Sequence, residues 1–222
     1  MSRPERPRLT TTAYALLGLL YTRSYSPYEL ARQMKRDLHF CWPRAERGIY
    51  YEPKNLVAQG LAAATVERTG RRKRTVYSIT TAGRRAFDDW IEQPPTEPAQ
   101  LESEAILRAT FGHRGTKEAL QQAIASLRED AAAMRRQMAS QAHEYATTGG
   151  PFPEQLHLIA LTGRFLIDYV TLLENWADWA QSRVQEWPTV RSARKVELDF
   201  AYEIFAEVDE AEAASVGPQL AE

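Results

Sequence analysis

The first ninety residues predict a series of short elements separated by turn signals. The threonines at 10–12 can cap an apolar run from 13 to 21, and a helix that is apolar on nearly every side must be buried. Ser26 followed by Pro27 is typical of a second helix start. In that second helix Leu30 and Met34 lie one turn apart and form its buried face.

A third helix is predicted between Arg44 and Gln59, with Ile49, Leu56 and Val57 facing the first two helices. Its other face carries cations, aromatic rings and an amide: Arg44, Arg47, Tyr50, Tyr51, Lys54 and Asn55. Pro53 removes one backbone donor, so we expect a kink or a later helix start. Gly60 is expected to end the helix in the left-handed conformation.

Two strand-like runs follow at 64–68 and 75–79, and Thr80 or Thr81 then caps a helix from 82 to 91. The predicted turn between the strands holds Gly70 and four consecutive cations: Arg71, Arg72, Lys73 and Arg74. Three helices followed by a strand, a cationic turn and a strand are typical of a winged helix-turn-helix. In that fold the third helix enters the major groove of DNA and the hairpin tip reaches the neighbouring backbone.

The remainder of the chain is predicted to be helical. Three prolines within 93–98 mark a linker, and Ser103 begins a short helix that ends near Gly112. Two long seams with spacings of three and four residues predict an antiparallel helix pair, because the residues at 147–151 can reverse the chain. The seam residues are Leu120, Ile124, Leu127, Ala131, Met134 and Met138, then Leu156, Ile159, Gly163, Leu166, Val170, Leu173, Ala177, Ala180, Val184 and Trp187.

A last helix, 195–213, is expected to cover this pair with its apolar positions, Leu198, Tyr202, Phe205 and Val208. The longer seam also has a flanking apolar stripe, Phe165, Tyr169, Leu172, Trp176 and Trp179. One partner helix cannot cover a face this wide, and a second subunit is the simplest cover. Alternatively, the stripe lines a pocket for an aromatic effector, with Arg164, Tyr169, Trp176 and Trp179 as candidates and Arg164 as the partner of a carboxylate.

The charge of the chain divides at the predicted linker. The formal net charge of -1 conceals 17 basic against 8 acidic residues up to Trp90, and 11 against 21 beyond it. The basic part makes nucleic acid a candidate partner. We therefore predict a mainly α protein: a winged helix-turn-helix domain at 1–92, a linker at 93–100, and a helical dimerisation and possible effector-binding domain at 101–222.

Signs of other chemistry are missing from the sequence. Four scattered histidines, a single Cys41 and the lack of a Gly-rich phosphate loop or nucleophile elbow argue against an enzyme, a metal site, a cofactor or an internal disulfide. No stretch approaches the roughly 20 apolar residues that span a bilayer. We expect a cytoplasmic protein without a membrane partner.

Several segments in combination resemble the PadR family of transcriptional regulators. They are the run 12–20, Tyr28 to Leu30, Gly48 to Tyr50 with Leu56, Gly60 and Leu61, and the stretch 77–83. The resemblance implies a winged helix-turn-helix, a homodimer held by C-terminal helices, and repression relieved by a small effector. It assigns Tyr50 and Lys54 to the recognition helix and Arg71 to Arg74 to the wing, whereas Pro53 stands where leucine is commoner.

The helical half resembles the virulence-activator-type C-terminal domain of longer family members. The favoured hypothesis is a dimeric repressor that reads a pseudo-palindromic site in double-stranded DNA. An activator of the same fold, or an adaptor that binds protein instead of a specific DNA sequence, remains open. RNA binding is weaker, because the sequence shows no aromatic-rich strand on which bases could stack.

Overall fold

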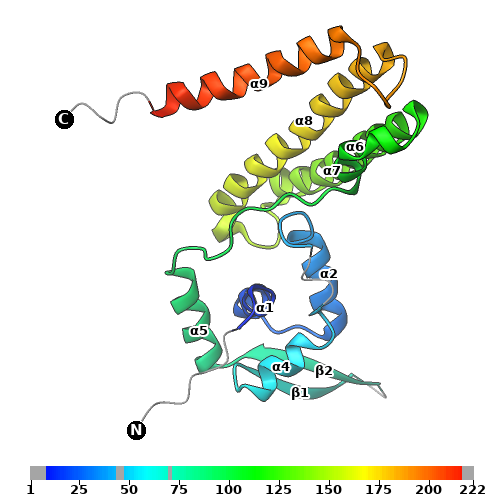
Figure 1. Cartoon of the computed structure of the whole chain (residues 1–222). Coiled ribbons are helices and arrows are strands. Elements are labelled where there is room, and N and C mark those ends of the chain that lie inside the picture. Colours follow the sequence, from blue (N-terminus) through cyan, green and yellow to red (C-terminus); the bar gives the residue numbers. More distant parts are fainter. Residues whose placement is uncertain (1–8, 44–47, 70–71, 217–222) are drawn as a thin grey trace, which may run out of the picture. The chain divides into compact units, whose positions relative to one another are not determined.

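A computed structural model describes residues 9–43, 48–69 and 72–216 of the 222. The chain divides into two compact units, Met1–Ala99 and Gln100–Glu222, and each is described by itself. The predicted mainly α fold with a two-stranded wing is confirmed (Figure 1).

In unit 1, helix α1 lies between α2 and α5, while α4 and the strand pair form one end of the unit (Figure 1). The elements are α1 (Thr11–Thr22), α2 (Pro27–Asp37), α4 (Glu52–Ala58), β1 (Ala62–Thr69), β2 (Arg72–Ile79) and α5 (Thr81–Ile91). The core centres on the buried side chains of α1, which pack with Leu30, Met34 and Leu56 and with the buried ring of Tyr25. This confirms that the apolar first helix is buried.

Side-chain oxygens begin three helices of this unit. The Thr10 hydroxyl accepts the N–H of Ala13 (3.1 Å), and Thr80 does the same for Gly83 (3.0 Å). Ser26 forms a capping box with Glu29, whose carboxylate accepts the backbone N–H of Ser26 at 2.8 Å. These bonds satisfy N–H groups that a helix start leaves without a partner.

Helix α4 begins later than the apolar pattern suggests, as Pro53 predicted. It starts at Glu52 with the proline in its first turn, where the missing donor costs nothing. Gly60 follows the helix with φ at +73°, confirming the left-handed end. Gly60 N–H donates to the Val57 carbonyl and Leu61 N–H to the Leu56 carbonyl, each at 2.9 Å, which is a Schellman motif.

The hairpin extends further than the predicted strands. β1 and β2 pair without interruption from Ala62 opposite Ile79 to Thr69 opposite Arg72. The expectation that residues 72–74 form a turn is therefore wrong, because backbone pairing continues past the β-branched residues that mark the strands in the sequence. Tyr25 adds an antiparallel bridge to the far side of β2, with backbone N–O distances to Tyr77 of 3.0 and 2.8 Å.

Unit 2 contains only helices among its described residues. They are α6 (Glu104–Thr110), a 3-10 turn η1 (Gly112–Arg114), α7 (Lys117–Thr148), a 3-10 turn η2 (Pro153–Gln155), α8 (Leu156–Glu186) and α9 (Lys195–Val216). α7 and α8 form the predicted antiparallel pair: Lys117 Nζ donates to the Gln185 carbonyl at 2.7 Å, and further along Arg135 Nε donates to Glu174 Oε2 at 2.9 Å. Seam residues of both helices form the core between them.

Helix α9 does not cover the helix pair, so that expectation is wrong. In Figure 1 it diverges from α8 after the turn that joins them. Its apolar side chains Leu198, Tyr202, Phe205 and Val208 are 46–69% exposed. Phe200 contacts α8, with its ring 5.9 Å from the ring of Trp179.

The segment from Pro153 through α8 is long and apolar enough to cross a membrane by length and composition. The expectation concerned an uninterrupted apolar run, whereas average hydropathy tolerates the few polar residues that interrupt this one. A helix with two apolar faces meets the same criterion. Here one face packs on α7 through Val170, Leu173 and Ala177, and Leu161 and Phe165 are exposed elsewhere on the helix.

Candidate nucleic-acid interface

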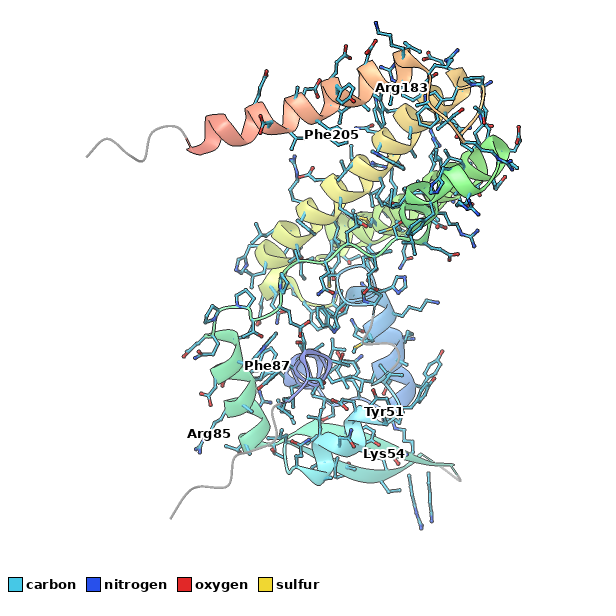
Figure 2. All side chains as sticks on the ribbon, viewed as in Figure 1. Tyr51, Lys54, Arg85, Phe87, Arg183 and Phe205 are labelled. Atoms are coloured by element: carbon cyan, nitrogen blue, oxygen red, sulfur yellow. The ribbon has the colours of Figure 1, made fainter. Side chains whose placement is uncertain are left out.

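The start of α4 exposes four of the predicted DNA-binding residues. Tyr50 and Tyr51 are 72% and 57% exposed, and Lys54 and Asn55 are exposed on the first turns of the helix. Figure 2 labels Tyr51 and Lys54 at the end of unit 1 where α4 lies beside the strand pair. Aromatic hydroxyls, an ammonium and an amide on one short segment can bind phosphates and base edges.

The buried side of the same turn anchors it to α1. Glu52 is 8% exposed, and its carboxylate accepts hydrogen bonds from Thr10 Oγ1 and Asn55 Nδ2, both at 2.9 Å. Pro53 beside it is fully buried. The two residues hold the first turn against the core, so the exposed side chains project from a rigid support. Because Asn55 donates to Glu52, its orientation is set from within the protein.

The strand register pairs the charges of the wing. Arg74 on β2 lies opposite Glu67 on β1, and its Nη2 is 2.9 Å from Glu67 Oε2. Arg68 lies opposite Lys73, so two cations face each other across the ladder, and both are exposed. Like charges directly opposite are unfavourable in a free hairpin and become favourable when an anion lies between them.

This register changes which cations are available. The charge of Arg74 is partly neutralised by Glu67. Hydrogen bonds from Ser26 lower the pKa of Glu29 on α2, and the nearby charges of Arg74 and Arg23 lower it further. Arg68 is a candidate that sequence reasoning missed, because only the register reveals that it faces Lys73. Arg44, Arg47 and Arg71 lie outside the described residues, and Arg72 is described only as the first residue of β2.

The four candidate effector residues of α8 make different contacts in the structure. Arg164 Nε donates to both carboxylate oxygens of Asp168, at 3.0 and 2.9 Å, so the proposed partner of a ligand carboxylate already has an acid. Tyr169 and Trp176 are partly buried against the α7–α8 core. Trp179 contacts Phe200 of α9 instead.

No family model matches the chain, but two curated sequences do. The negative transcriptional regulator PadR of Bacillus subtilis is 30% identical over 100 residues, which are 44% of this chain and 54% of PadR. A probable transcriptional regulator of Mycobacterium tuberculosis is 32% identical over 90 residues, 39% of this chain and 48% of the relative. The matched part thus spans about half the length of these curated relatives, which are named as transcriptional regulators and not as enzymes.

Solved structures match over most of the chain. B. subtilis PadR with operator DNA has a TM-score of 0.60 at 20% identity, covering 77% of this chain and 99% of PadR, and the same protein with p-coumaric acid has 0.54 at 18%, covering 81% and 100%. The Vibrio cholerae virulence activator AphA has 0.53 at 24%, covering 79% and 98%. These likenesses establish the fold, and with the sequence matches they confirm the resemblance to the PadR family.

Proposed function

We propose that this chain, which has the fold of PadR-family regulators, is a dimeric, sequence-specific DNA-binding transcriptional regulator. The observation that carries the proposal is the surface formed by α4 and the wing. It combines exposed Tyr50, Tyr51 and Lys54 with the facing cations Arg68 and Lys73, on elements fixed by Glu52 and by strand pairing. The operator complex of B. subtilis PadR supports this use of the fold.

We place α4 in the major groove and the wing on the neighbouring backbone. Tyr50, Tyr51, Lys54 and Asn55 then contact bases and phosphates, together with Arg44 and Arg47 from the preceding segment. Arg71, Arg72, Lys73 and Arg74 bind phosphates from the wing, with Arg68 added and the contribution of Arg74 reduced by Glu67. Phosphate contacts supply affinity and register, whereas contacts to base edges supply sequence preference.

Dimerisation is proposed through the apolar faces that unit 2 leaves open. Leu158, Leu161, Phe165 and Leu172 on α8 are 54–69% exposed, and Phe205 on α9 is 69% exposed. A monomer gains nothing from exposing so many large apolar side chains, and a second copy would bury them. A two-fold dimer presents two α4 helices, which is the reason to expect a pseudo-palindromic DNA site in the cytoplasm.

The regulator is proposed to be a repressor that a small aromatic molecule releases from DNA. The name of the negative regulator PadR and its complex with p-coumaric acid support this direction of control. AphA, named as an activator, has the same fold and supports the alternative of an activating role. A reporter placed behind the bound DNA separates the two roles, since deletion of a repressor raises expression and deletion of an activator lowers it.

The primary test is a gel shift with the purified full chain. The probes are DNA from upstream of its own gene, a random duplex of equal length, and a structured RNA. We expect the upstream DNA to bind at least tenfold tighter than either competitor. Equal affinity for all three would reject the specific regulator and favour the adaptor. Lys54→Ala should weaken the shift, while Lys195→Ala, the same change in unit 2, serves as the matched control.

A further inference from the structure

A groove in unit 1 lies beside the start of α1, outside the exposed residues of α4 and the wing that form the candidate interface. Its volume is about 1520 Å³, and it lies between the start of α1, helix α5 and the segment 93–97 that follows α5. Thr11 Oγ1 donates to Glu97 Oε1 at 2.9 Å, which ties this segment across the groove to α1. The groove is therefore bounded by two helices and by a strap that a side-chain hydrogen bond holds.

An aromatic pair forms part of the groove wall. The rings of Tyr14 on α1 and Trp90 on α5 are stacked, with centroids 4.8 Å apart and planes 8° from parallel. Leu9, Leu61 and the prolines of the strap continue the apolar lining. Such a surface favours a flat aromatic ring system, which gains contact area on the wall without ordering a flexible chain.

The charged residues of the groove favour a positive ligand. Asp89 and Glu97 contribute two carboxylates against one cation, Arg85. Arg85 lines the groove from α5, as Asp89 does, and leaves the acids in excess by one charge. A cation in the groove would meet two carboxylates and the electron-rich face of an indole, and an anion would be repelled by the acidic pair.

The groove also reaches the recognition helix. Thr10 and Gln59 line it, and a second cavity of about 380 Å³ shares both residues and adds Tyr51, Glu52 and Asn55. Thr10 caps α1 through its accepting lone pair and donates its hydroxyl proton to buried Glu52. A ligand that displaces Thr10 therefore acts on the residue that anchors the first turn of α4.

From these observations we propose that the groove between α1, α5 and the strap 93–97 binds a planar aromatic cation, and that occupancy is transmitted to α4 through Thr10 and Glu52. This inference rests on the proposed function, because it supplies the regulator with an effector site. It moves that site from α8, where the four candidate residues are divided between different contacts, to unit 1.

The binding test uses the full chain without DNA and two acridines of similar shape and opposite charge. We expect 9-aminoacridine to bind, measured by fluorescence anisotropy, and acridine-9-carboxylate to bind at least tenfold more weakly. Replacing both groove acids, Asp89→Asn with Glu97→Gln, should weaken the cation at least tenfold. The matched control, Asp88→Asn with Glu92→Gln, makes the same charge change on residues that do not line the groove and should alter affinity less than twofold.

Equal binding of the two acridines would contradict the proposed site. So would an unchanged affinity for 9-aminoacridine in the Asp89→Asn, Glu97→Gln variant. Trp90→Phe keeps a stacking ring and should retain binding, whereas Trp90→Leu should lose it, with circular dichroism verifying that both variants fold. Trp179→Leu on α8 should leave affinity unchanged, and a loss there instead would return the site to unit 2. Because DNA is absent, this test can fail while the gel shift succeeds, and the reverse.

The coupling is tested by hydrogen exchange of the α4 amides with and without saturating 9-aminoacridine. We expect the cation to change exchange across residues 54–58 in the wild type and in Thr10→Ser, which keeps both hydrogen bonds. Thr10→Asp retains a capping oxygen but cannot donate to Glu52. In this variant the ligand-induced change in hydrogen exchange should disappear, while 9-aminoacridine should still bind. Unaltered exchange in the wild type overturns the coupling.

Discussion

Arg68 on β1 lies directly opposite Lys73 on β2, so two exposed cations face each other across the antiparallel ladder. In the protein without DNA these two side chains repel each other, and a phosphate bound between them would remove the repulsion. The facing cations therefore favour the anion-bound hairpin over the free hairpin.

Removal of one of these cations should therefore have opposite effects on stability and on DNA affinity. Arg68→Ala is expected to raise the free energy of unfolding by a few tenths of a kcal/mol, about the scale of a cross-strand pair. It should also weaken DNA binding and reduce the slope of log affinity against log salt by about 0.9, which corresponds to one phosphate contact. Urea titration and fluorescence anisotropy at several salt concentrations measure the two quantities.

Lys73→Ala should repeat this result, and Arg191→Ala in unit 2 should leave the salt slope unchanged. An unchanged slope in both wing variants would remove the pair from the contact surface. Glu67→Gln is the complementary change: it frees Arg74 from its ion pair at 2.9 Å and should steepen the slope.

Gly83, the glycine of α5, has no room for a side chain. A Cβ atom there would lie 2.0 Å from the Leu61 carbonyl oxygen, which also accepts the N–H of Thr80 at 3.1 Å. Gly83→Ala must push α5 away from Leu61, in the connection between α4 and β1, and we expect a loss of about 3 kcal/mol in unfolding free energy. Thermal unfolding by circular dichroism measures it.

Gly163→Ala provides the comparison, because a Cβ atom at that position in α8 meets nothing within 4 Å. The substitution should stabilise the helix by up to about 1 kcal/mol. If Gly83→Ala were as well tolerated as Gly163→Ala, the close packing of α5 on Leu61 would be wrong.

The ion pair between α7 and α8 should make unit 2 sensitive to acid. Hydrogen bonds from Arg135 lower the pKa of Glu174 below its ordinary value of 4.5. A lowered folded pKa means that the stabilisation is complete above the ordinary value and is lost as the pH falls through the folded one. Both side chains contact solvent, so the effect should be less than about 1 kcal/mol.

Glu174→Gln is the variant that tests this dependence, with urea midpoints measured from pH 7 to pH 3. Wild type should be more stable than the variant near neutrality, and the difference should shrink as the pH drops below 4.5. Glu203→Gln on exposed α9 should track the wild type throughout. A difference between wild type and Glu174→Gln that stayed constant across this range would contradict the assigned pair.

Charge placed on the open apolar faces of unit 2 should dissociate the proposed dimer. Leu161 and Phe165 are each 69% exposed, so glutamate at either position costs the isolated chain little. Burial of that glutamate against a second copy would be expensive, and we expect Leu161→Glu with Phe165→Glu to weaken self-association at least a hundredfold. Sedimentation velocity over a concentration series measures the change.

The control for this prediction is Val66→Glu on the wing, where a similarly exposed apolar residue is replaced away from unit 2. Its self-association should equal that of the wild type. A wild-type chain that stays monomeric at high micromolar concentration would reject dimerisation without bearing on the α7–α8 packing.

Local signals in the sequence determined where most elements begin and end. Ser26 with Pro27, Thr80 and Gly60 act within a few residues of themselves, so capping oxygens, a proline at a helix start and a left-handed glycine have the same effect in any fold. The heptad seams likewise determined the α7–α8 pair, because their burial requires each seam to face the other. The charge division between the basic and acidic parts was also evident from the sequence.

Only the tertiary structure decided which of the predicted functional residues share a surface. The strand register places Arg68 opposite Lys73 and pairs Arg74 with Glu67. No local sequence pattern encodes these cross-strand pairings. Likewise, residues 169 and 176 pack against the α7–α8 core while Trp179 contacts α9, because tertiary packing decides which neighbour each part of a helix surface meets. Helix caps and turn residues act within one turn of the chain, so the sequence predicts them. The grouping of side chains on one surface depends on contacts between distant segments, so only the tertiary structure shows it.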